Sequence, residues 1–156
     1  MFVGNFRSLK KQNRKSTMVC FSFDDVERWT FPYGIDKYII LMQKLCDEWN
    51  MGLKILENLS GNEATREFIR NANVAYIHFR SALNLAVFST RKEDVDTNNE
   101  ELKICVENEF LLTKRLISIL PEDSKNGFEM TNHYYYNLNL LFEKLVLLKE
   151  IMSLLK

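Results

Sequence analysis

An unbroken stretch from Glu63 to Arg91 constrains the fold of this chain more than any other feature. It contains no Pro and no Gly, so no residue in it is a strong helix breaker. Several polar residues lie along it, and buried polar groups need hydrogen-bond partners. We therefore expect a central helix with neighbours on more than one side. Its apolar residues recur at steps of three and four, the period of a helix with one buried face: Phe68, Ala72, Ala75, Tyr76, Phe79, Leu83, Ala86 and Val87.

Three further stretches have the same apolar period and predict helices near residues 35–59, 98–120 and 138–155. Ser60 lies three residues before Glu63, and Thr97 three before Glu100, which are capping-box spacings at helix starts. Pro121 is expected to end the third helix. Gly52, inside the first, indicates either a close helix contact or a local loss of stability.

These patterns predict an all-α fold without a substantial sheet. The expected architecture is an antiparallel four-helix bundle over residues 35–156, preceded by an extended N-terminal arm over residues 1–34. The hydrophobic fraction of 46% and the charged fraction of 27% are ordinary for a globular domain.

Composition argues against several classes of function. Lys plus Arg and Asp plus Glu are each 21, so the net charge is zero, which argues against a broad basic surface for nucleic acid. No apolar run reaches the roughly 18 residues that a membrane span needs. The three cysteines, Cys20, Cys46 and Cys105, form no CxxC or Cys/His cluster. Reduced, buried thiols in a cytoplasmic protein are therefore expected, without a metal or another cofactor.

One candidate site lies on the central helix. Arg80, Asn84 and Arg91 fall on nearly one helical line, and arginine forks bind carboxylates or phosphates. The alternative, which we favour, is an internal ion-pair network with an acidic residue such as Glu107 or Glu109. These two glutamates form no ExxH motif, which argues against a di-iron bundle.

The two histidines and the aromatic clusters are the other candidates. His78 or His133 could act as a general base, but no Ser/Asp pattern surrounds either, and a structural role is favoured. Trp29 precedes the first helix, beside an Asp24-Asp25 pair for which a turn or helix-start role is favoured. The longest irregular stretch, residues 121–137, contains an aromatic run that suits sugar stacking or a protein interface, although packing within the bundle is favoured: Asn132, His133, Tyr134, Tyr135 and Tyr136.

Three stretches together resemble a known kind of protein. They are SFDDVERWTFPYG with the following helix (22–53), AYIHFRSALNLAVFSTRKED (75–94) and ENEFLLTKRLISILPEDSKNGFEMTNHYYY (107–136). They are similar to the helical C-terminal region of large bacterial glycoside-hydrolase-like proteins, in which a catalytic barrel precedes an all-α domain. The similarity covers most of residues 22–150. It implies a carbohydrate-related context, catalytic carboxylates in an upstream barrel, and no independent catalysis by this chain.

Two functions of different classes follow. The first is a non-catalytic accessory domain, the detached C-terminal module of such a protein, which packs on a barrel through Trp29, Phe31, Tyr33 and the loop around Tyr134–Tyr136. The second is a stand-alone bundle that binds or converts a small ligand in a pocket lined by Arg80, Asn84, His133 and Tyr135. The expected partners are a catalytic-barrel domain, a second copy of the chain or a carbohydrate, and neither nucleic acid nor a membrane.

Overall fold

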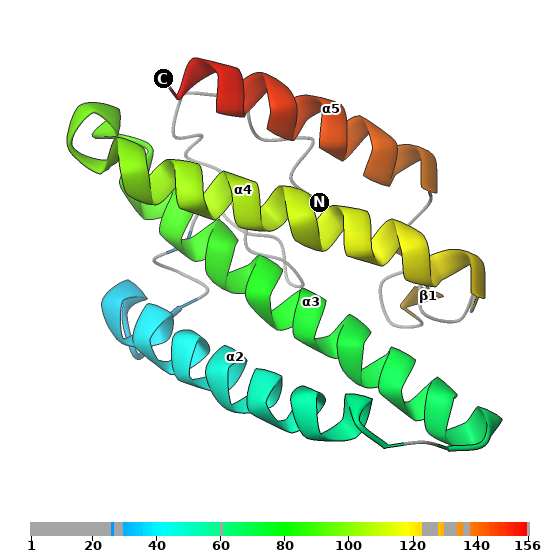
Figure 1. Ribbon diagram of the computed structural model, residues 1–156. Coiled ribbons are helices and arrows are strands. Elements are labelled where there is room, and N and C mark those ends of the chain that lie inside the picture. Colours follow the sequence, from blue (N-terminus) through cyan, green and yellow to red (C-terminus); the bar gives the residue numbers. More distant parts are fainter. Residues whose placement is uncertain are drawn as a thin grey trace.

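The computed structural model describes Val26 and residues 30–59, 61–122, 128–129, 134–135 and 138–155. Over these residues the chain is all-α, as predicted, and its helices pack in sequence order as an up-down four-helix bundle (Figure 1). Helix α3 lies between α2 and α4, which confirms its expected central position, and α5 packs on α4. The helices are α2 (Ile35–Glu57), α3 (Glu63–Arg91), α4 (Val95–Ile119) and α5 (Leu138–Leu154).

The helix starts show where the predicted caps were wrong. The Asn62 side chain caps α3 by accepting a hydrogen bond from the Thr65 amide at 3.1 Å, whereas Ser60 lies outside the described residues. Helix α4 begins at Val95, three residues earlier than predicted, because the Asp94 carboxylate accepts from the Thr97 amide at 3.4 Å. Thr97 is therefore inside the helix and not its cap.

The described segments outside the four helices are turns and one short β-pair. Val26 and residues 30–34 form a turn in which the Thr30 carbonyl accepts from the amides of Tyr33 and Gly34. The rest of the predicted arm, including Asp24, Asp25 and Trp29, lies outside the described residues. A 3₁₀ turn, η1 (Leu120–Glu122), follows α4. The stretch expected to be irregular contains an antiparallel pair, β1 (Phe128–Glu129) with β2 (Tyr134–Tyr135).

The core of α3, α4 and α5 consists of two apolar clusters, one at each end of the packed helices. The first contains Val74, Ile77, Leu112, Leu116, Leu120 and Leu141. The second contains Phe88, Leu102, Cys105, Val106, Leu148 and Leu155. Helix α2 contributes to neither cluster, so it is attached separately through its contact with α3.

The α2–α3 interface is centred on Trp49. Its indole nitrogen donates to the Ala72 carbonyl at 2.9 Å, and its ring packs edge-on against Phe79, with centroids 5.1 Å apart. Cys46 and Leu53 are buried beside it. Because a buried indole N–H needs an acceptor, this hydrogen bond fixes the position of α2 along α3.

Among the described residues, no helix combines the length and the apolar character that crossing a bilayer requires.

Candidate functional site

A polar layer separates the two apolar clusters of the α3–α4–α5 core. Its centre is Glu109 of α4, a residue that is 1% exposed. One carboxylate oxygen, Oε1, accepts from the Ser81 hydroxyl at 2.6 Å and from the Lys144 ammonium at 2.5 Å. The other, Oε2, accepts from the Asn84 amide at 2.8 Å. The layer therefore joins three helices through one carboxylate.

Neighbouring positions on each helix show why we call this a layer. On α3, Ser81 and Asn84 lie between the apolar positions 77 and 88, and on α5 Lys144 lies between 141 and 148. Glu109 lies likewise between positions 106 and 112. A shift of one helix by a single turn would move a charge into an apolar cluster. The layer therefore favours one register of the three helices over its neighbours.

The chemistry available to Glu109 follows from this geometry. Both oxygens already accept charge-assisted or amide hydrogen bonds, and the carboxylate is shielded from water. A general acid or base must reach a substrate proton directly or through one water molecule. Glu109 would have to break its bonds with Ser81 or Lys144 to do so, and the arrangement therefore suits a structural ion pair.

Arg80, Asn84 and Arg91 do not converge on one anion site, because each has a different partner. Arg80 donates to Gln43 of α2 at 3.0 Å, Asn84 donates to Glu109, and Arg91 pairs with Glu101 of α4 at 3.1 Å. The favoured alternative, an internal network that includes Glu109, is what the structure shows for Asn84. The cation in that network is Lys144, however, and not an arginine.

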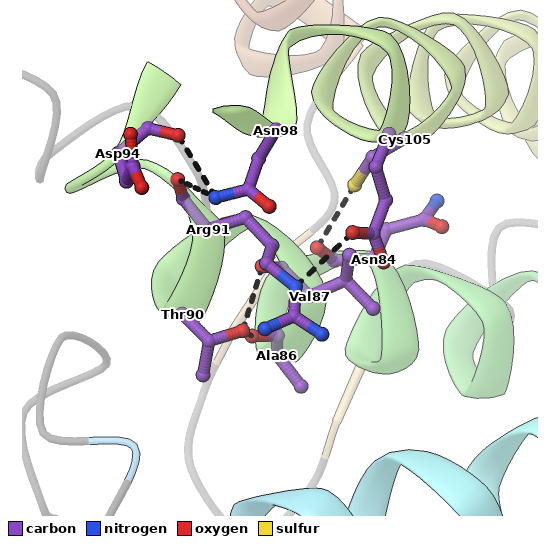
Figure 2. Close-up of polar contacts among 9 residues, drawn as sticks. Asn84, Ala86, Val87, Thr90, Arg91, Asp94, Asn98 and Cys105 are labelled. Atoms are coloured by element: carbon purple, nitrogen blue, oxygen red, sulfur yellow. Dashed lines mark hydrogen bonds and ion pairs between the residues drawn. The ribbon is translucent and has the colours of Figure 1, made fainter. Parts of the chain in front are cut away.

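Two buried thiols, Cys46 of α2 and Cys105 of α4, interact with polar groups of α3. The Cys105 thiol donates to the Asn84 carbonyl at 3.1 Å, and Figure 2 shows its sulfur directed across the α3–α4 interface. Burial, followed by the nearby Glu109 carboxylate, raises the pKa of Cys105 to about 12. Burial also raises the pKa of Cys46, partly opposed by the Arg80 guanidinium. Both thiols are free and buried, as the sequence predicted; Cys20 lies outside the described residues.

The connection between α3 and α4 is fixed by local hydrogen bonds. The side-chain amide of Asn98 donates to the backbone carbonyls of Asp94 and Arg91 at 2.8 and 3.4 Å (Figure 2). The Thr90 hydroxyl bonds back to the carbonyls of Ala86 and Val87 in α3. These contacts satisfy backbone groups at a helix end. Arg91 therefore has a structural role in the connection between α3 and α4.

The other predicted site residues give less information. Trp29, Asn132, His133 and Tyr136 lie outside the described residues. For Tyr134 and Tyr135 the structure gives the backbone of β2, paired with β1. His78 is half-buried on α3 and has an interaction partner. The ligand-binding and partner-binding roles of these residues therefore stay predictions.

A stripe of exposed apolar residues on α2 is one feature that sequence reasoning missed. We define the α2 outer face as Ile40, Lys44, Glu48, Met51 and Ile55, which recur at steps of three and four on the side opposite Cys46 and Leu53. Ile40, Met51 and Ile55 are 67%, 61% and 68% exposed. Leu41 and Leu59 flank the face and are also exposed. The signal was present in the sequence, because α2 has apolar residues on both of its sides.

Lys144 and Ser81 were also missed. The sequence signal for Lys144 was its position between Leu141 and Leu148, within the apolar stripe of the last helix. Ser81 gave no comparable signal, because a serine occurs on any helix face.

Within the described part of the chain, no three His, Cys, Asp or Glu side chains group together in a way that could hold a metal ion. Comparison of the chain with models of protein families, with curated proteins and with solved structures found no match.

Proposed function

We propose that this chain is a non-catalytic helical interaction domain that binds a protein partner through the α2 outer face. The observation that carries the proposal is the exposure of three large apolar side chains along one stripe, Ile40, Met51 and Ile55. Exposed apolar surface bordered by polar residues is characteristic of protein interaction sites, and here Lys44 and Glu48 lie between Ile40 and Met51. Phe31, in the turn before α2, is also exposed, at 80%.

The polar interior supports the same proposal. The most buried charged groups, Glu109 and Lys144, bind each other and hold three helices together. The alternative, a pocket around Arg80 and Asn84, would need Asn84 to release Glu109 before it met a ligand. The geometry therefore favours an interaction domain over a ligand-binding or enzymatic bundle.

The resemblance to glycoside-hydrolase-like proteins supports a more specific form of the proposal. In that form the domain is an accessory module of a carbohydrate-active protein that also contains a catalytic barrel. A direct assay tests the non-catalytic part: the pure chain should not hydrolyse a panel of aryl glycosides. Turnover that is lost on replacing one acidic residue would contradict the proposal.

Site-specific photocrosslinking tests the interaction itself. A photoreactive phenylalanine analogue is placed at Ile55 and, as a matched control, at Leu111 of α4, which are 68% and 63% exposed. We expect a discrete crosslinked partner from position 55 in the source cell and none from position 111. The identified partner, once purified, should bind the wild-type chain and Leu111→Lys but not Ile55→Lys. Equal crosslinking from both positions, or equal binding of both variants, would overturn the proposal.

A further inference from the structure

We propose that the partner of the α2 outer face is a second copy of this chain, bound as an antiparallel two-fold pair of α2 helices. The inference rests on the proposed function and names the partner of the same surface. The observation behind it is that the charges at the centre of this face, together with Leu41 and Met51 beside them, are arranged so that the centre of the face complements itself.

The central charges of the face set the register. Lys44 and Glu48 lie two residues on either side of position 46, within the exposed stripe. If a two-fold axis runs between the two helices, perpendicular to them and at the level of position 46, Lys44 lies level with Glu48 of the second copy, and Glu48 with Lys44. Each pair then occurs twice, as a two-fold interface requires. A parallel pair would instead place lysine beside lysine and glutamate beside glutamate, which is repulsive.

One apolar pair matches in the same register. Ile40 lies level with Gly52, and Ile55 with Lys37, so the apolar contact is that of Leu41 with Met51. These two residues lie five positions before and five after position 46, and their side chains meet across the axis. Both residues are exposed in the single chain. The two ionic contacts are then flanked by apolar contacts on both sides. A charge pair that is partly shielded from water in this way contributes more than one in water.

The single chain leaves these charges available. Within one chain Lys44 Nζ lies 3.8 Å from Glu48 Oε1, and the two side chains are 71% and 62% exposed. This is a loose surface pair of the kind that contributes little to stability. Its members can turn to the second copy without a large cost to the fold. Figure 1 shows α2 at the edge of the helix row, with α3 on one side only.

Charge reversal provides the test, measured by sedimentation velocity over a concentration series of the full chain. The wild-type chain should show a concentration-dependent dimer. Lys44→Glu and Glu48→Lys each place like charges opposite each other twice, and each should weaken the dimer at least about tenfold. Mixing the two variants should restore a dimer, because every cross-chain contact is then between opposite charges. Leu111→Lys, an exposed substitution on α4, should leave the dimer unchanged.

Three outcomes would overturn the proposal. They are a wild-type chain that stays monomeric into the high micromolar range, a dimer that both single variants retain, and two monomeric variants that form no dimer on mixing. Circular dichroism shows whether each variant is folded, and the mixing step detects complementarity that misfolded chains could not produce. A monomer that still crosslinks to another protein from position 55 would overturn self-association while supporting the interaction domain.

Discussion

Glu109 is a buried carboxylate that connects the three C-terminal helices. An ionised carboxylate without partners inside an apolar core would be strongly destabilising. Here two neutral donors and one ammonium surround it. The pair with Lys144 is buried, with side chains 2% and 10% exposed. If one partner is removed, water therefore does not take its place beside the other.

Removing Lys144 should therefore destabilise the fold sharply. We expect Lys144→Met to lower the free energy of unfolding by about 3–5 kcal/mol, because it leaves Glu109 as a buried charge without its cation. Urea denaturation measures this. Arg91→Met is the control: its pair with Glu101 is roughly half exposed, so its loss should cost less than about 1 kcal/mol.

The double variant Glu109→Leu with Lys144→Met sharpens this test. It removes both charges, so it should be less destabilised than Lys144→Met alone. Equal costs for Lys144→Met and Arg91→Met would show that Glu109 does not depend on its cation.

Cys105 should make stability depend on pH in the alkaline range. Its pKa is raised from 9.0 to about 12 in the folded chain. Between these values the unfolded chain loses the thiol proton while the folded chain keeps it, so stability is complete below the lower value and falls as pH rises. The expected slope is about 1.4 kcal/mol per pH unit. Urea denaturation at several pH values, compared with Cys105→Ala, isolates this slope from other groups. Parallel curves for the two proteins would contradict the assignment.

At the scale of elements, α2 offers a direct test of one residue that the sequence left ambiguous. Gly52 indicated either a close contact or a loss of stability. A Cβ at this position would meet no atom within 4 Å, so no contact requires glycine. We expect Gly52→Ala to raise the free energy of unfolding by up to about 1 kcal/mol, because alanine restricts the unfolded chain and favours the helix.

Thermal unfolding of Gly52→Ala measures the gain, and Gly61→Ala is the matched control. At Gly61 an added Cβ would lie 2.3 Å from the Cβ of Thr65, so the turn before α3 would have to shift. A higher melting temperature for Gly61→Ala than for Gly52→Ala would contradict this comparison.

The helices themselves were predictable because their apolar stripes are long. The bounds of α3 agree with the prediction from Glu63 to Arg91, and no helix breaker competes within that stretch. The start of α4 was not predictable in the same way. Asp94 and Thr97 are both good capping residues three positions apart, and the hydrogen bond from the Thr97 amide to Asp94 decides between them.

At the scale of the whole molecule, the candidate site was less predictable than the fold. Periodicity tells which helix face is apolar, but it does not tell which helices meet. The partner of Glu109 is Lys144, 35 residues away in sequence, and only the packing of α5 on α4 brings them together. The exposed face of α2 has the same origin. Its second apolar side is identified as surface only when α3 is seen to cover the other one.

The arrangement of the helices predicts an order of local opening. Helices α3 and α4 each pack against two neighbours, and α5 adds residues to both apolar clusters. Helix α2 contributes to neither cluster, and its main contact is with α3. Opening α2 therefore exposes the Trp49 interface while the Glu109 layer stays intact. Because local stability follows buried contacts, we expect the amides in the middle of α2 to exchange with deuterium faster than those in the middle of α3 and α4.

Hydrogen–deuterium exchange with peptide-level detection measures this order, and the Lys44→Glu variant provides the monomer reference. If the α2 helices pair, α2 protection in the wild-type chain should rise with protein concentration, whereas protection in α3 and α4 should not. The charge-reversed variant should show fast α2 exchange at every concentration, because it lacks the second copy. Exchange of α2 as slow as that of α3 in this variant would contradict the order of opening. It would mean that the Trp49 interface holds α2 as firmly as the two clusters hold the other helices.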